Sequence, residues 1–353
     1  MHLHGWANFD LHGRGIAVQN AHPAHSERNA KSGDRRRIGP AEELLKIIAL
    51  INAAAGTGGT ADRAGAAREA LSAAGVDADV RPTDGHDMEA AARRALAEGA
   101  GLIIVGGGDG TVSTVAGVVA GTGAKLAVLP MGTLNHFARD LHVPPRLEHA
   151  ARLIAEAIGQ GDGAAPAARA VDLGEVNGRR FINNASIGLY PHIVSKRERQ
   201  QQRLGRNKWL ALLVAAASIF RRYPVLQVVL DTGDRALRTT TPFVFVGNNR
   251  YEMSLLAASG RACLDHGELS LYFTHRTGRF GLLRLALRGL FGRLDQGKDF
   301  EALCLPEVTI DTRKKTLRIA LDGEVTRMPP PLRFCVLPGA LRVIAPPPGT
   351  DNP

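Results

Sequence analysis

Residues 102–111, which read LIIVGGGDGT, decide the fold. The first four are aliphatic and form a short apolar run typical of a fully buried strand, and three glycines follow directly. An apolar helical pattern then runs over residues 112–120. Glycine lets the backbone approach a ligand closely, and the first turn of a helix presents unpaired N–H groups. The stretch therefore predicts a buried strand that leads into a phosphate-binding loop.

Three common functional motifs that contain a glycine turn are excluded here. Counting from Gly106, a dinucleotide fingerprint needs a third glycine where Thr111 stands, and a Walker A loop needs a Gly-Lys-Ser/Thr that does not follow. A nucleophile elbow is absent too, because residues 184–188 (NASIG) begin with asparagine in place of glycine. The alternative left open is an ordinary strand-to-helix turn, for which one or two glycines would suffice.

Outward from this motif, apolar strands alternate with helical segments. We expect strands over residues 47–51, 79–81, 102–105 and 125–129, and helices over residues 61–74, 86–98, 112–120 and 147–158. Such alternation is typical of a parallel sheet with helices on both faces. The pattern predicts a doubly wound α/β nucleotide-binding domain over residues 46–168.

Beyond a Gly/Ala/Pro-rich stretch at 159–168, the pattern changes to short strands. Those expected are 169–176, 180–184, 226–231, 243–246, 269–274, 307–311 and 317–321. They predict a second, β-rich domain over residues 169–340, built as an antiparallel sandwich. A last strand at 341–345, within the C-terminal segment 341–353, is compatible with a return to either domain. Residues 1–45 predict a mobile tail and no signal peptide.

Composition and charge restrict the classes of binding partner that we expect. The chain has 44 Lys and Arg against 34 Asp and Glu, a formal charge of +10 that favours anionic partners. No helix-turn-helix, zinc finger or aromatic–basic RNA motif accompanies this charge, so we expect no nucleic acid as a partner. Three cysteines without Cys-x-x-Cys spacing indicate a reducing, cytoplasmic location. No run approaches the roughly 20 apolar residues of a membrane span, and the nearest is 209–220.

Two motifs carry a family resemblance. Residues 107–111 (GGDGT) followed by residues 129–139 (LPMGTLNHFAR) are similar to the catalytic domain of the diacylglycerol kinase and sphingosine kinase family, in its soluble bacterial lipid-kinase branch. The first motif is shared with NAD kinases, whereas Asn135 and Phe137 in the second are specific to the lipid kinases. The resemblance runs from about residue 46 to residue 346 and takes in residues 181–188, 247–249 and 321–324.

The resemblance implies that ATP and Mg²⁺ are bound and that a lipid hydroxyl is phosphorylated. The implied ATP contacts are backbone amides and hydroxyls around the triphosphate, and Asp109 is placed to hold the metal with the phosphates. The implied ATP-binding residues are Asn52, Gly56, Thr57, Thr83, Gly107, Gly108, Asp109, Gly110, Thr111, Val112, Ser113 and Thr133.

The same resemblance places the catalytic base at Glu324, within residues 321–324 (LDGE). A carboxylate there can accept the proton of the lipid hydroxyl as the hydroxyl oxygen attacks the terminal phosphate. Asp109 is the alternative base.

The chain departs from the family pattern at several positions. The first loop reads NAAAG at 52–56, where relatives often have Asn-Pro-x-Ser-Gly, so that one hydroxyl is missing. Ser113 and Thr114 replace the usual Asn-Glu pair, and His136 replaces a frequent aspartate. We expect the phosphate-binding loop to survive these changes and nucleotide binding to be weakened by the first.

A structural Mg²⁺ site of the bacterial relatives is altered as well. Their Asp-Asp-Gly turn reads LDHGE here, at residues 264–268, so that His266 replaces the aspartate ligand before the glycine. Mg²⁺ prefers oxygen ligands. We therefore expect no structural metal at this turn unless Asp265 takes over as the ligand.

Two basic segments suggest a contact with lipid. Residues 195–223 hold eight Lys and Arg against one Glu, and residues 276–298 hold six against one Asp with leucines interleaved. A basic amphipathic helix can lie on an anionic membrane surface, although a solvated helix face over a buried one gives the same pattern. We expect peripheral association with the inner face of the cytoplasmic membrane.

Together the residues and the resemblance predict an ATP-dependent lipid kinase with a diacylglycerol-like acceptor. One alternative is an NAD kinase, against which residues 132–137 argue. The other is a non-catalytic lipid- or nucleotide-binding protein, favoured by the altered first loop and His266 but disfavoured by the intact glycine loop and Glu324. The sequence does not distinguish one lipid alcohol from another, nor does it set the oligomeric state.

Overall fold

The computed structural model describes residues 45–53, 62–161, 167–188, 225–250, 261, 263–274 and 300–346. The predicted N-terminal tail, the apolar run at 209–220 and both basic segments lie outside these ranges. Within the described part of the chain, every helix is too short or too polar to cross a bilayer.

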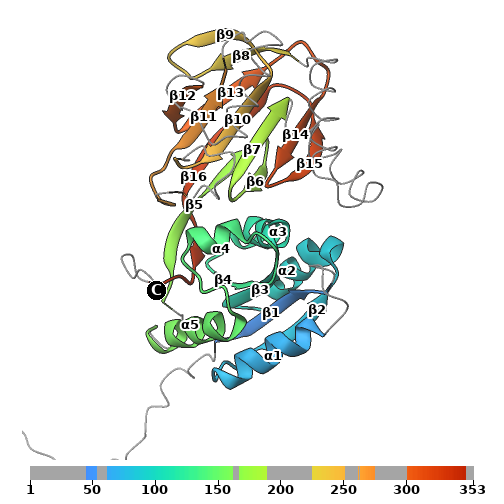
Figure 1. The fold of residues 1–353 in the computed structure, drawn as a ribbon, viewed down its shortest axis with the longest axis vertical. Coiled ribbons are helices and arrows are strands. Elements are labelled where there is room, and N and C mark those ends of the chain that lie inside the picture. Colours follow the sequence, from blue (N-terminus) through green and yellow to red (C-terminus); the bar gives the residue numbers. More distant parts are fainter. Residues whose placement is uncertain are drawn as a thin grey trace, which may run out of the picture. The chain divides into compact units, whose positions relative to one another are not determined.

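Four parallel strands form the first part of the larger sheet. Their order is β2 (Asp79–Thr83), β1 (Ile47–Asn52), β3 (Leu102–Gly107) and β4 (Lys125–Pro130) (Figure 1). The chain moves from β1 outward to β2 and then back across β1 to β3. The order therefore reverses between β1 and β3, and the carboxyl ends of these two strands are where open α/β sheets bind their ligands.

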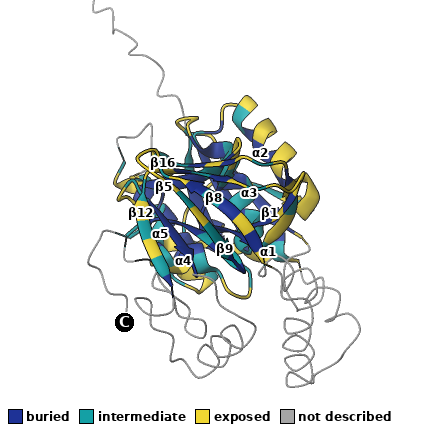
Figure 2. Cartoon of the chain, turned by 90° about the horizontal axis from the view of Figure 1, so that it is seen from above, coloured by how far each residue is buried: buried dark blue, intermediate teal, exposed yellow. Residues whose placement is uncertain are grey.

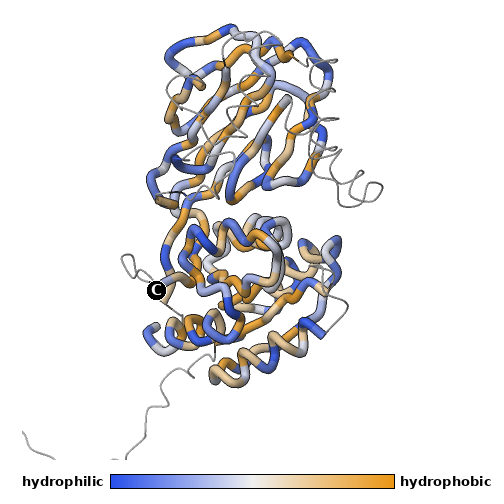
Figure 3. Tube along the Cα trace, viewed as in Figure 1, coloured by the Kyte–Doolittle hydropathy of each residue, from blue (hydrophilic) through white to orange (hydrophobic). Residues whose placement is uncertain are grey.

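Helices cover both faces of these strands. On one face α1 (Arg63–Ala73) contacts α5 (Leu147–Gly159), and on the other α2 (Met88–Ala97) contacts α3 (Asp109–Val119) (Figure 1). Because both faces are covered, the strand residues 102–105 are fully buried, and the same stretches are hydrophobic in Figure 3. Figure 2 shows exposed residues gathered along α1 and α2 instead. The predicted doubly wound α/β fold is confirmed.

One helix begins earlier than the sequence predicts. Helix α3 starts at Asp109 rather than at residue 112, because Gly108 is extended (φ −90°, ψ −179°) and acts as the N-cap. The acidic residue of the motif therefore sits in the first helical turn, where a negative charge is favoured by the helix dipole. A short helix that the sequence did not predict, α4 (His136–Asp140), follows the loop after β4.

The larger sheet continues from β4 into antiparallel strands. The further strands in order are β16 (Leu332–Val343), β13 (Glu307–Asp311), β8 (Leu226–Asp231) and β9 (Ala236–Thr241), with β5 (Arg169–Val176) paired to β16 and to β6 (Arg179–Phe181). The end of β16 pairs in parallel with β4, so the last strand does return to the first half.

A second, antiparallel sheet packs on these strands. Its order is β12 (Glu301–Leu305), β11 (Leu269–Phe273), β10 (Phe243–Asn248), β7 (Asn184–Gly188), β14 (Leu317–Leu321) and β15 (Glu324–Met328). Alternate residues of both sheets enter one apolar core, in which the rings of Phe181 and Phe334 meet edge to face at 6.4 Å. The predicted β-rich sandwich is confirmed.

The β-rich half also contains differences from the sequence prediction. The predicted strand 180–184 is wrong, because the chain leaves β6 after Phe181 and begins β7 at Asn184. The backbone N–H groups of Ile182 and Asn183 donate to the side chain of Asp322 rather than to a neighbouring strand. Strands β9, β12 and β15 were not predicted, and of β7 only Asn184 was.

Strand β5 belongs to both cores. Its residues Val171 and Leu173 pack in the core of the α/β half, whereas Val176 packs in the core of the sandwich. The boundary that we placed after residue 168 therefore falls at the start of a strand that both halves share.

Candidate active site

Two glycine-containing loops meet at the carboxyl ends of β3 and β4. A Cβ atom on Gly132 would lie 2.4 Å from the Cα of Gly108, so the two backbones touch. The side-chain amide of Asn135 fixes the second loop, because its oxygen accepts from the Gly132 N–H at 2.9 Å and its nitrogen donates to the Gly132 carbonyl at 2.9 Å. A side chain at Gly132 would push the loops apart, and its absence leaves backbone groups exposed to a ligand.

The end of β1 joins this pair of loops. The Asn52 side chain donates to the Thr111 hydroxyl at 2.7 Å, and Asn52 is paired with Thr83 on β2. The structure thus brings three predicted ATP-binding side chains together at the point where the strand order reverses. Gly56 and Thr57, which continue the first loop, lie outside the described residues.

Asp109 is half-buried in the first turn of α3. Its Oδ1 accepts from the Phe137 N–H at 3.1 Å, which ties the first glycine motif to α4. Its Oδ2 has no hydrogen-bond partner in the ranges that the structure describes. One carboxylate oxygen is thus used for positioning, and the other is available to a metal ion or a phosphate-bound water.

The remaining predicted ATP-binding residues are placed differently. Val112 is 3% exposed and its N–H donates to the Gly108 carbonyl, so its side chain is buried and its amide is engaged within the protein. The Ser113 hydroxyl donates to the Asp322 carboxylate. Thr133 is exposed in the loop between β4 and α4.

Glu324 comes to the glycine loop from the far end of the sequence. It is the first residue of β15 and is exposed, and its Oε1 lies 3.3 Å from where a Cβ on Gly110 would stand. The two carboxylates that the sequence singled out, Asp109 and Glu324, therefore flank the same loop.

The turn that carries Glu324 is held by a half-buried aspartate. Asp322 has a left-handed backbone (φ 46°) and accepts hydrogen bonds from the backbone N–H groups of Ile182, Asn183 and Asn184 at 2.8 to 2.9 Å. Burial raises the pKa of Asp322, and the hydrogen bond from Ser113 opposes the shift most strongly. Asp322 thus connects the β14–β15 turn to the β6–β7 corner and to α3.

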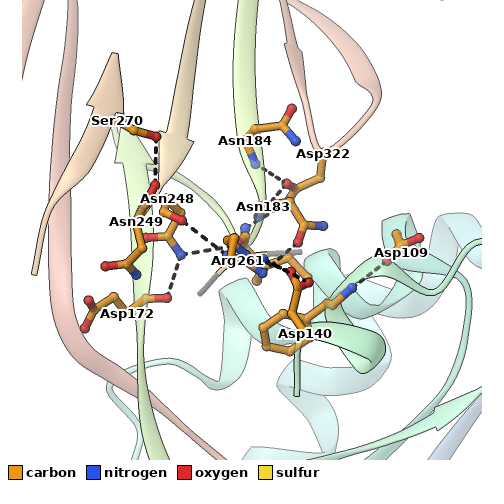
Figure 4. A network of polar contacts seen from close by, with 12 residues as sticks. Asp109, Asp140, Asp172, Asn183, Asn184, Asn248, Asn249, Arg261, Ser270 and Asp322 are labelled. Atoms are coloured by element: carbon orange, nitrogen blue, oxygen red, sulfur yellow. Dashed lines mark hydrogen bonds and ion pairs between the residues drawn. The ribbon is translucent and has the colours of Figure 1, made fainter. Parts of the chain in front are cut away.

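A buried ion pair that the sequence analysis missed lies beside this turn. Arg261 Nε is 2.8 Å from Asp140 Oδ2, and the side chains are 0% and 6% exposed (Figure 4). The two residues are 121 positions apart, so no local pattern could have paired them. The only signal available was the position of Asp140 directly after the second motif.

The residues at the altered turn do not suit a structural Mg²⁺ ion. Asp265 is already paired with Arg169 at 2.9 Å, and His266 Nδ1 lies 3.1 Å from Cys263 Sγ. The Gly267 N–H donates to Asp172 at 2.7 Å. The carboxylate that would have to replace the lost ligand is thus engaged by a guanidinium, and the turn is closed by protein contacts.

The fold and these groups define a class of protein: an α/β domain with a glycine loop at the ends of its parallel strands, to which an attached β-sandwich brings a carboxylate. Residues 46–163 match the diacylglycerol kinase catalytic domain. The chain is similar to a diacylglycerol kinase of Mycobacterium tuberculosis H37Rv, with 29% identity over 317 residues that cover 86% of this chain and 96% of that protein.

Two further similarities agree with this match. A Pseudomonas fluorescens protein named "Probable lipid kinase YegS-like" is 33% identical over 285 residues, which cover 80% of this chain and 90% of the relative. The crystal structure of a diacylglycerol kinase from Bacillus anthracis str. Sterne has the same fold, with a TM-score of 0.61, 22% identity and coverage of 86% of this chain and 98% of that one. The chain belongs to the bacterial family of diacylglycerol kinase-like lipid kinases.

Proposed function

We propose that this lipid kinase transfers the terminal phosphate of ATP to the hydroxyl group of a diacylglycerol-like lipid. The observation that carries the proposal is the position of Glu324 Oε1, 3.3 Å from where a Cβ on Gly110 would stand. A phosphate held by the glycine loop would thus lie next to a carboxylate that can accept a proton.

The donors around the loop suit a triphosphate. The contact between Gly108 and Gly132 leaves room for phosphate oxygens against backbone, and the N-terminus of α3 favours negative charge there. Asp109 offers the hard oxygen ligand that Mg²⁺ prefers, so it would hold this ion together with phosphate oxygens. When bound, Mg²⁺ neutralises charge on the phosphates.

The chain's own residues then account for the transfer. The lipid hydroxyl oxygen forms a bond to the terminal phosphorus, the bond from that phosphorus to the oxygen of ADP breaks, and Glu324 accepts the hydroxyl proton. Asp109 is held at Oδ1 by the Phe137 N–H, which leaves its other oxygen for the metal ion and the phosphates. Glu324 is exposed, which lets a hydroxyl on a bulky lipid reach it.

The acceptor also implies a membrane surface. The formal charge of +10 and the basic residues of segments 195–223 and 276–298 support peripheral binding to the anionic inner face of the cytoplasmic membrane. Flotation with vesicles of neutral lipid, with and without an anionic lipid, tests this part. We expect binding only with the anionic lipid, and equal binding to both would contradict it.

The decisive assay follows labelled terminal phosphate from ATP, with and without Mg²⁺, to lipid alcohols in mixed micelles. The panel holds diacylglycerol, phosphatidylglycerol and a sphingoid base, and NAD is the water-soluble competitor. We expect a labelled lipid that requires Mg²⁺, with diacylglycerol the best acceptor. Labelled NADP without labelled lipid would overturn the proposal, and ATP binding without any product would identify a binding protein instead.

A further inference from the structure

Arg261 is a fully buried cation placed between the two halves of the active site. Its side chain is 0% exposed and donates in three directions: Nε to Asp140 Oδ2 at 2.8 Å, Nη1 to the Ile182 carbonyl at 2.6 Å and Nη2 to Asn183 Oδ1 at 2.9 Å (Figure 4). Burial of a charge is costly and is offset only where the charge is paired and hydrogen-bonded. The guanidinium therefore helps to fix the positions of these three groups.

One set of contacts leads from Arg261 to Asp109. Asp140 is the last residue of α4, and the Phe137 N–H of the same helix donates to Asp109 Oδ1 at 3.1 Å. The guanidinium carbon also lies 5.9 Å from the centre of the Phe137 ring. A helix of five residues has little stability of its own, so tertiary contacts such as these set its position.

The second set of contacts leads from Arg261 to Glu324. Arg261 holds the β6–β7 corner through the Ile182 carbonyl and the Asn183 side chain. The backbone N–H groups of the same two residues donate to Asp322, at 2.8 Å each. Asp322 is two residues before Glu324 in the β14–β15 turn, so the corner positions the turn that carries the base.

We propose that Arg261 is a positioning residue that fixes Asp109 and Glu324 relative to each other. The inference rests on the proposed function, because it concerns the two carboxylates of that reaction. Arg261 touches neither carboxylate and acts through Asp140 on one side and through Asn183 and Asp322 on the other.

The geometry requires arginine rather than any cation. The planar guanidinium directs its donors to both sets of contacts at once, whereas a lysine ammonium is a point charge on a flexible stem. Arg261→Lys keeps the charge beside Asp140, and so avoids the unpaired buried carboxylate that Arg261→Ala would leave. It gives up the simultaneous contacts with Asp140 and with the β6–β7 corner.

The test compares Arg261→Lys with the wild type and with Arg169→Lys in the labelled-phosphate assay. Arg169 is a matched control because it also pairs with a carboxylate, that of Asp265 at 2.9 Å. It takes part in neither of the two sets of contacts described for Arg261. We expect Arg261→Lys to lower kcat by at least tenfold while the KM for ATP changes less than threefold. We expect Arg169→Lys to leave both within twofold. An unchanged kcat, or a KM for ATP that rises by the same factor as kcat falls, would overturn the inference.

Hydrogen exchange provides a readout that does not depend on activity. In Arg261→Lys the amides of Phe137 and of Ile182 and Asn183 should exchange at least tenfold faster, while those of β1 and β3 stay unchanged. Faster exchange at only one of the two places, or at neither, would show that Arg261 does not join them. If the wild type phosphorylates no lipid, the proposed function fails, and the exchange rates alone decide whether Arg261 connects the two segments.

Discussion

The two halves of the molecule contribute to the site by different means. The α/β half presents backbone at the ends of parallel strands, where Gly108 and Gly132 touch and helix α3 begins. The sandwich presents a side chain, Glu324, on a turn whose place depends on the hydrogen-bonded carboxylate of Asp322. A backbone site recognises any phosphate chain of the right shape, whereas a side chain on a turn can be moved or replaced. Nucleotide binding and phosphate transfer should therefore be separable by mutation.

The largest effect should be a loss of ATP affinity on substitution of a glycine in the α/β half. In Gly132→Ala the new Cβ would stand 2.4 Å from the Gly108 Cα, so the two loops must separate. We expect ATP affinity to fall by roughly 100-fold or more, about 3 kcal/mol or more of binding free energy. Isothermal titration with a non-hydrolysable ATP analogue measures it.

Gly159→Ala is the matched control for that change. Gly159 ends α5, and a Cβ there would meet no atom within 4 Å. Its ATP affinity should equal that of the wild type. Wild-type affinity in Gly132→Ala as well would show that the loop contact does not shape the nucleotide site.

A smaller effect is expected at Ser113, where substitution should lower kcat without changing ATP affinity. The resemblance assigns Ser113 to ATP, whereas its hydroxyl donates to Asp322 in the structure. We expect Ser113→Ala to lower kcat by roughly 3- to 10-fold, which corresponds to the 0.5–1.5 kcal/mol of one hydrogen bond, and to leave ATP affinity within twofold. Steady-state kinetics and titration together measure it.

The opposite pattern at Ser113 has a definite meaning. A tenfold loss of ATP affinity with kcat unchanged would show that Ser113 contributes to ATP binding, as the resemblance implies. Thr114→Ser serves as the control, because its hydroxyl donates within α3, to the Gly110 carbonyl at 2.9 Å, and serine keeps this donor.

The smallest effect concerns stability of the α/β half alone. The Arg81 guanidinium, 2.7 Å from Glu98, lowers the pKa of that carboxyl from an ordinary 4.5 to about 2. A lowered folded-state pKa means that the stabilisation is present above pH 4.5 and disappears as the pH falls through about 2. Because both side chains are about a third exposed, we expect Glu98→Gln to lower the Tm only slightly at pH 7.

Thermal unfolding across pH checks this prediction. The difference in Tm between wild type and Glu98→Gln should shrink below pH 4.5 and vanish near pH 2. A difference that stays constant over that range would show that the ion pair does not account for it.

The sequence predicted the glycine loop of the α/β half better than the side-chain contacts of the sandwich, for a physical reason. A buried parallel strand and its glycine loop depend on consecutive residues, so residues 102–111 alone predicted both the strand and the loop. Ser113 and Asp322 are 209 positions apart, and Arg261 and Asp140 are 121 apart. Contacts of this kind depend on how strands pair, which local patterns do not contain.

Edge strands and corners were missed for a related reason. Strand β9 (ALRTTT) and strand β15 (EVTRM) are mostly polar, so they lack the apolar runs by which the other strands were found. The corner at Ile182 and Asn183 was predicted as a continued strand, although Asn183 is of a residue type that favours turns. Its bend depends on Asp322, which supplies hydrogen-bond acceptors from another part of the chain.

The central claim is that the sandwich supplies the base to a nucleotide site built by the other half. Its most direct test is the kcat and ATP affinity of Glu324→Gln, beside Glu307→Gln, an exposed glutamate on β13, as the control. We expect Glu324→Gln to lose roughly 10²- to 10⁴-fold in kcat, the usual contribution of a general base, with ATP affinity within twofold of the wild type and Glu307→Gln unaffected. Wild-type turnover in Glu324→Gln would contradict it.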